Sequence, residues 1–86
     1  MKDGLIVYLV GGAEAPAGAS LQAAARALGH EGQEVEVVSE VEGFFAVEDA
    51  WHFLLTRGCG RIHMVVAAPA GPESLRPLSP PVRLCG

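Results

Sequence analysis

The fold depends on how the segment FFAVEDAWHFLLTRG, residues 44–58, divides between strand and helix. Its first four residues, 44–47, form a continuous apolar run, which is typical of a strand covered on both faces. From Glu48 onward apolar residues recur at helical spacing, the acids suit a helix amino terminus, and Gly58 stops the pattern. The segment therefore predicts a short buried strand followed directly by a helix.

Three further elements are predicted upstream of this segment. Residues 5–10 (LIVYLV) are continuously apolar and predict a second buried strand. Residues 20–28 are rich in alanine and leucine, with Ser20 as a candidate cap and Gly29 at the end, which predicts a helix. Residues 34–40 (EVEVVSE) alternate between charged and apolar, which indicates a half-exposed strand.

The last predicted strand, residues 61–67, alternates in its first half and precedes Pro69. The element order is then β-α-β-β-α-β. The two continuously apolar strands belong at the centre of a sheet, and the two alternating strands belong at its edges. This pattern predicts an α+β fold, the ferredoxin-like βαββαβ sandwich, with an antiparallel sheet in the order 4-1-3-2 and both helices on one face.

Charge and proline are distributed unevenly along the 86 residues. Residues 1–68 contain four basic and nine acidic side chains, whereas residues 69–86 contain five of the six prolines. Because proline cannot continue a helix or a central strand, we expect a ferredoxin-like domain over 1–68 and a proline-rich C-terminal tail over 69–86. The tail could dock on an apolar surface or stay loosely attached.

Composition excludes several classes of protein. Half of the residues are hydrophobic, which argues against intrinsic disorder, and six basic residues against ten acidic ones argue against nucleic-acid binding through a basic surface. The apolar runs are too short to cross a bilayer, and the amino terminus has no signal-peptide pattern. We therefore expect a cytoplasmic domain with neither a nucleic-acid nor a membrane partner.

Residues capable of chemistry are scattered in the sequence. No histidine or cysteine spacing matches a metal site, no serine lies in a nucleophile elbow, and the paired acids fall at turns and helix starts. The pair Gly11-Gly12 precedes a helix but lacks the ending of a phosphate-binding loop. We expect no catalytic residue, no metal and no cofactor, and hence no enzyme.

A ferredoxin-like sheet with both helices on one face would leave its other face uncovered. The central strands are apolar on both faces, and such a surface is rarely left to solvent, so we expect a homo-oligomer formed through the open sheet face. Tyr8 and His63 could meet on that face if their strands are neighbours. There they could line a ligand pocket between subunits.

Residues Ser39-Glu40-Val41-Glu42-Gly43 resemble the turn before the second helix of the small ferredoxin-like thiamine-binding proteins of the YkoF-like type. Residues 60–66 resemble their last strand, so that the likeness covers residues 5–67. The resemblance implies sheet-to-sheet oligomers that bind a thiamine-like or other small heterocyclic ligand. It adds Ser39 and Glu42 to Tyr8 and His63 as candidate ligand-binding residues. Residues 38–44 also resemble the nitrogen-regulatory proteins, without their long loop.

A second resemblance is to the ThiS/MoaD-like β-grasp sulfur carriers. Residues 16–21 and Ala27-Leu28-Gly29 resemble their first helix, and Gly60-Arg61-Ile62 falls near the expected spacing. The chain ends in Leu84-Cys85-Gly86 rather than in the Gly-Gly that these carriers use. A β-grasp domain would also replace the predicted second helix with a short turn.

These observations favour a small-molecule-binding or sensory domain without catalysis. Two alternatives remain open, namely a β-grasp protein related to the sulfur carriers and a purely structural or protein-interaction module.

Overall fold

Strands and helices alternate through the computed structural model, which describes residues 2–11 and 18–84. The elements are β1 (Lys2–Leu9), α1 (Gly18–Arg26), β2 (Glu34–Ser39), the 3-10 turn η1 (Glu40–Glu42), α2 (Phe44–Thr56), β3 (Cys59–Gly71), β4 (Ser74–Pro77) and β5 (Val82–Arg83). They form one sheet with helices packed against it. The predicted α+β class is therefore confirmed.

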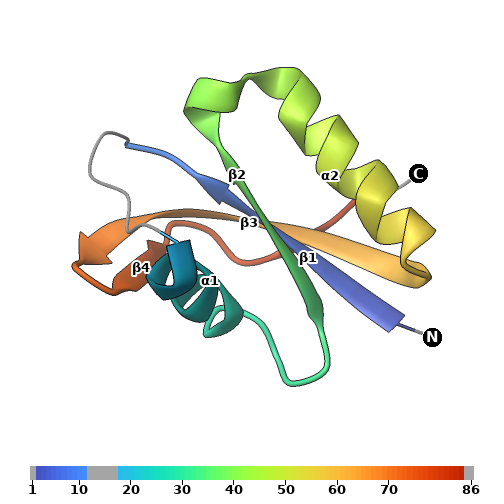
Figure 1. The fold of residues 1–86 in the computed structure, drawn as a ribbon, viewed down its shortest axis with the longest axis horizontal. Helices are drawn as coiled ribbons and strands as arrows, with labels where there is room; N and C mark the ends of the chain where they lie inside the picture. The colour runs from blue at the N-terminus through green and yellow to red at the C-terminus, as the bar shows by residue number, and fades with distance from the viewer. Residues whose placement is uncertain (1, 12–17, 85–86) are drawn as a thin grey trace.

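The centre of the sheet is β1, which has a parallel neighbour on each side (Figure 1). The strand order is β2-β1-β3-β4, and β5 also pairs with β3. Both β4 and β5 run antiparallel to β3. The ferredoxin-like prediction of an antiparallel sheet in the order 4-1-3-2 is therefore wrong.

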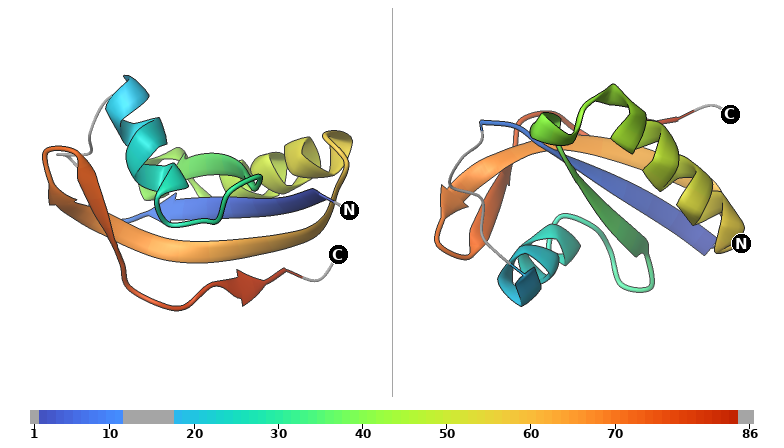
Figure 2. Two further views of the ribbon diagram at one scale, coloured as in Figure 1. Left: turned by 90° about the horizontal axis from the view of Figure 1, so that it is seen from below. Right: turned by 45° about the horizontal axis from the view of Figure 1, so that its top comes forward.

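The two helices lie on opposite faces of the sheet (Figures 1 and 2). Leu5 and Val7 of β1 share a core with Ala25 of α1, whereas Ile6, which lies between them, shares a core with Leu54 of α2. The chain passes from β1 to its neighbour β2 and then back past β1 to β3. Two crossovers of the same hand must then use opposite faces. The expectation that both helices cover one face is wrong for this reason.

Residues 44–47 are the first turn of α2 and not a strand. Gly43, with φ of 88°, separates η1 from α2, and the helix continues to Thr56. Phe45 is 77% exposed, which a residue in a central strand would not be. A four-residue apolar run fits a buried strand or one turn of a helix equally well. The predicted second helix is confirmed but begins at Phe44. Because residues 44–47 are not a separate strand, the chain makes two helical crossovers, and each of them joins parallel strands.

The proline-rich segment belongs to the sheet. β3 continues to Gly71, and β4 and β5 then pair back along it, so the predicted boundary after residue 68 falls inside β3. Of the two alternatives for the tail, the docked one matches the structure up to residue 84. The expectation that residues 61–67 form an edge strand is wrong, because β4 and β5 cover that edge. Pro77 ends β4, and Pro80 and Pro81 lie between β4 and β5 along this outer edge, where missing N–H donors are tolerated.

Each face of the sheet therefore has its own helix and its own core. The uncovered apolar face from which we expected a homo-oligomer is not found in the described part of the chain. Within residues 2–11 and 18–84, no helix combines the length and the apolar composition that a membrane crossing needs.

Candidate functional site

Tyr8 and His63, the first two predicted ligand-binding residues, lie on opposite faces of the sheet. Tyr8 packs into the core under α2. His63 lies between Ile62 and Met64, which both face α2, so its side chain points to the α1 face. In the parallel register His63 is opposite Leu5, and Tyr8 is opposite Val66. The two side chains cannot line one pocket, so that this part of the prediction is wrong.

Ser39 and Glu42 lie close together at the carboxyl end of β2. The Ser39 hydroxyl accepts a hydrogen bond from the Val41 backbone N–H at 3.4 Å and caps η1. Glu42 is exposed at the end of η1 and lines a cleft beside α2. Ser39 therefore has a structural role here, and only Glu42 of the four predicted residues lines this cleft.

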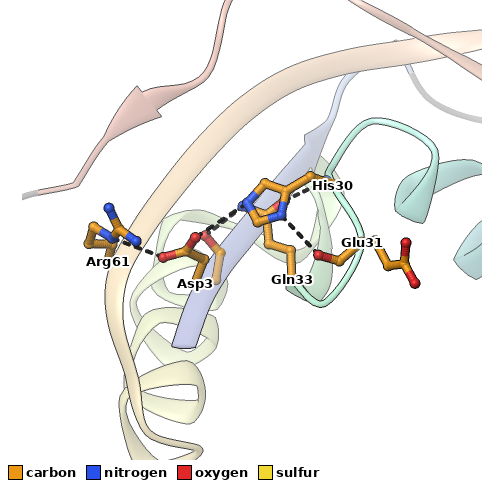
Figure 3. A network of polar contacts seen from close by, with 6 residues as sticks. Asp3, His30, Glu31, Gln33 and Arg61 are labelled. Atoms are coloured by element: carbon orange, nitrogen blue, oxygen red, sulfur yellow. Dashed lines mark hydrogen bonds and ion pairs between the residues drawn. The ribbon is translucent and has the colours of Figure 1, made fainter. Parts of the chain in front are cut away.

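A polar network joins the amino-terminal part of β1 to β3 and to the loop before β2 (Figure 3). One carboxylate oxygen of Asp3 accepts from Arg61 Nε at 2.9 Å, and the other lies 3.3 Å from His30 Nε2. The His30 Nδ1 atom lies 3.1 Å from the backbone oxygen of Glu31. Gln33 extends the network, since its side chain accepts from the His30 N–H and donates to the Gly4 oxygen.

This network contains an aspartate–histidine pair, which in enzymes can orient a general base. A histidine that acts as a base needs one ring nitrogen free for the reacting proton. Both ring nitrogens of His30 already have protein partners, and no nucleophilic side chain takes part in the network. The network thus fastens the loop to the sheet and supports no catalytic role.

A second ionic network lies on the α2 face, at the same end of the sheet, and joins β2 to β1 and to the end of α2. The Glu34 carboxylate lies 3.3 Å from Arg57 and 3.8 Å from Lys2. The Arg57 guanidinium also lies over the ring of Phe53, 5.7 Å from its centroid. Glu34 is consequently neutralised by neighbouring cations and is not available to a ligand.

Two further candidates for chemistry, Cys59 and Gly11, are also engaged within the fold. Cys59 is buried, and burial raises the pKa of its thiol above the ordinary value of 9.0, an effect that the Glu34 carboxylate reinforces. The N–H of Gly11 donates to the Glu40 carboxylate at 3.0 Å, so a negative charge already lies beside the loop that could have held phosphate. Gly12 lies outside the described residues. Among the residues that are described, no group of three or more metal-ligating side chains converges.

The cleft between β2 and α2 is the candidate site. Its volume is about 360 Å³. The helix side is formed by residues spaced i, i+3, i+4 and i+7 along one face of α2, and the strand side by three consecutive residues of β2. Together with Glu42, the lining residues are Glu36, Val37, Val38, Ala46, Asp49, Ala50 and Phe53.

The cleft combines an apolar surface with uncompensated negative charge. Val38, Ala50 and Phe53 supply the apolar part, and Phe53 is 47% exposed. Glu36, Glu42 and Asp49 supply three carboxylates. None of the three has an ion-pair or hydrogen-bond partner in the described part of the chain. Such a surface suits a ligand that is both cationic and apolar.

Sequence reasoning missed most of this cleft. In the sequence, Asp49 is one of the acids at a predicted helix start, and Glu36 belongs to the charged side of the alternating segment 34–40. The spacing of Ala46, Asp49, Ala50 and Phe53 marks one helical face, but this face is recognisable only once the helix is known to begin at Phe44.

No family model matches the chain, and comparison with curated proteins and with solved structures finds no match either. The fold and the cleft define a small domain of mixed helices and strands in which a parallel β2-β1-β3 core carries one helix on each face.

Proposed function

We propose that the chain is a binding domain without catalysis whose binding surface is the β2–α2 cleft. The observation that carries the proposal is a set of three carboxylates around an apolar floor, none of which has a partner among residues 2–11 and 18–84. By contrast, Cys59 is buried, and both ring nitrogens of His30 have protein partners.

Electrostatics favours a cationic ligand in this cleft. Glu36, Glu42 and Asp49 line the same small volume and repel one another, and the chain as a whole has a formal net charge of −4. A bound cation relieves this repulsion, and walls of low dielectric constant strengthen its attraction. The ring of Phe53 already attracts the guanidinium of Arg57, and aromatic rings generally favour cations near their faces.

A thiamine-like or other cationic heterocycle has the required chemistry and remains a candidate ligand. Such a ligand would contact Glu36, Glu42 and Asp49. Tyr8 and His63 would take no part in the site. A cytoplasmic location and a homo-oligomer remain predictions as well. An oligomer would have to form through edges or helices, because each sheet face is covered by its own helix.

The test is a titration of the isotopically labelled protein with thiamine, followed by amide chemical shifts. We expect shifts confined to β2, η1 and the cleft-facing side of α2. The double substitution Glu36→Gln/Asp49→Asn should weaken binding at least about 10-fold, since each charge-assisted contact contributes on the order of 1.5–3 kcal/mol.

The matched control is Glu31→Gln/Glu73→Gln, which removes the same charge from two exposed acids away from the cleft. If both double variants weaken binding equally, only the net charge matters and the cleft is not the site. Shifts centred on the His30 network would also contradict the proposal.

A further inference from the structure

The outer edge of β2 is the first feature that points to a specific kind of ligand. β2 is the end strand of the sheet, and within the described residues it pairs only with β1. In an edge strand, every second residue directs its backbone N–H and C=O away from the sheet. These groups can form a ladder with an additional strand.

The β2–α2 cleft opens along this edge. Three consecutive residues of β2 line it, namely Glu36, Val37 and Val38. Their side chains alternate between faces, since Val37 packs toward α1 and Val38 packs toward α2. A cleft lined by both kinds of residue must include the backbone edge between them, and not one face of the strand alone.

The helix leaves room beside this edge. Ala46 and Ala50 are the smallest of the side chains that α2 contributes to the cleft, and Phe53 forms its apolar end. A strand placed beside β2 would direct alternate side chains under α2, toward these residues.

The opposite edge of the sheet is closed to such pairing. It is formed by β4, β5 and the residues between them, and it contains Pro77, Pro80 and Pro81. The N–H of Leu78 donates inward to Val66 O at 2.7 Å, so the neighbouring Pro77 nitrogen lies on the outward side, where it has no hydrogen to donate. Residues 34–39 contain no proline, and β2 is therefore the edge available to a partner.

Charge decides which partner can occupy it. Two copies of β2 paired about a twofold axis would bring the acidic side chains Glu34 and Glu36 of both strands together, and like charges across a strand pair are destabilising. Glu34 is held by Lys2 and Arg57. Glu36, Glu42 and Asp49 have no such partner in the described residues. A strand with basic side chains complements these three acids, whereas a second copy of this chain does not.

We propose that the occupant of the β2–α2 cleft is an extended peptide segment that adds a strand to β2. Glu36 faces α2, because its partner Ile6 packs on that side, so the acids and the apolar residues of the cleft lie on one face of the sheet. The peptide therefore carries both basic and apolar side chains at the alternate positions that face α2. This rests on the proposed function, in which the cleft is the binding surface. Backbone hydrogen bonds to β2 hold the peptide, its apolar side chains pack against Ala46, Ala50 and Phe53, and its basic side chains contact the acids.

The experiment compares the binding of two blocked seven-residue peptides to the full chain. In both peptides lysine and valine take turns at every second position, with threonine between them, so that both kinds of side chain face α2. One peptide has ordinary amides, and the other has every amide nitrogen methylated, which keeps its charges and side chains but removes its backbone donors. We expect the first to bind with Kd below about 1 mM, to protect β2 amides from hydrogen exchange, and to bind at least about 10-fold more tightly than the methylated analogue. Glu36→Gln/Asp49→Asn should weaken it at least about 10-fold, and Glu31→Gln/Glu73→Gln should not.

The other outcomes separate the two proposals. Equal binding of both peptides, or binding without protection of β2, overturns strand addition but leaves the cleft as a cation site. Binding of thiamine without binding of either peptide also overturns strand addition and preserves the proposed function. If neither peptide nor thiamine binds, both proposals are wrong. A circular dichroism spectrum unchanged from the parent chain shows that each variant is folded.

Discussion

Substitution of Leu54 by alanine tests the placement of α2 directly. Leu54 is 1% exposed and shares a core with Ile6 of β1 and Ile62 of β3. The next residue, Leu55, is 43% exposed. The helical phase of α2 therefore predicts very different costs for Leu54→Ala and Leu55→Ala, although the two changes are chemically identical.

The magnitude follows from the burial of each side chain. Leu→Ala removes three carbons, each contributing about 0.8 kcal/mol when buried, and adds the cost of the cavity that remains. The surroundings of Leu54 are tight, because a Cβ on Gly4 would lie only 3.1 Å from Leu54 Cδ1. We expect Leu54→Ala to lower the free energy of unfolding by about 3–4 kcal/mol, and Leu55→Ala by about 1 kcal/mol or less.

Urea unfolding followed by fluorescence measures both values. Trp51 is the only tryptophan in the chain and packs against the same core as Leu54, so it reports on this region. A chain of 86 residues is expected to have a stability of about 4–13 kcal/mol, and Leu54→Ala could therefore unfold it. Leu54→Val, at a smaller cost, keeps the comparison measurable in that case. Costs for Leu54→Ala and Leu55→Ala that agree within about 0.5 kcal/mol would refute the assigned helical phase.

Three further predictions concern other parts of the molecule. Gly4→Ala should destabilise the fold by about 1–2 kcal/mol, because the new Cβ would meet Leu54 Cδ1 at 3.1 Å and Cys59 Sγ at 3.2 Å. The double variant Gly4→Ala/Leu54→Ala should lose less stability than the two single variants together, and strictly additive losses in urea unfolding would contradict this packing. Folding favours the neutral thiol of Cys59, whose pKa is raised, so the stability that this thiol contributes is fully present below the ordinary pKa of 9.0 and is lost as pH rises above it. The urea midpoint of the parent chain should therefore fall more steeply between about pH 8 and 10.5 than that of Cys59→Ala, and parallel pH profiles would exclude the effect. Asp3→Asn removes the ion pairs with Arg61 and His30 and should lower the free energy of unfolding by about 1 kcal/mol or less, and this loss should shrink in high salt. A salt-independent loss of several kcal/mol in thermal unfolding would show that the network does more than fasten a loop.

Local patterns predicted most of the elements. The continuous run at residues 5–10 marks β1, the alanine-rich stretch marks α1, and the alternation at residues 34–40 marks β2 and its place at an edge. Gly58, with φ of 90°, lies just after the end of α2, as its position in the sequence indicated. Each of these features depends on residues a few positions apart, so propensity and periodicity suffice to recognise it.

The candidate site was much less predictable. Glu42 was named from the sequence, and the structure places it in the cleft, whereas Glu36 and Asp49 gain their interest only when β2 lies beside α2. Whether Tyr8 and His63 lie on the same face of the sheet depends on the register of β1 and β3. The observed register places the two side chains on opposite faces. A shift by one residue reverses the face of every side chain in a strand, and no local pattern fixes that shift.

The sequence by itself determined the small acidic domain, its class, and the position and type of most elements, because these follow from local preference and from the spacing of apolar residues. Only the tertiary structure decided that residues 44–47 begin a helix, that the strands of the core run parallel, and that the proline-rich segment closes one edge of the sheet. The physical reason is that a four-residue apolar run and a proline-rich segment are each compatible with more than one local conformation. Which one forms depends on the distant residues against which the segment packs.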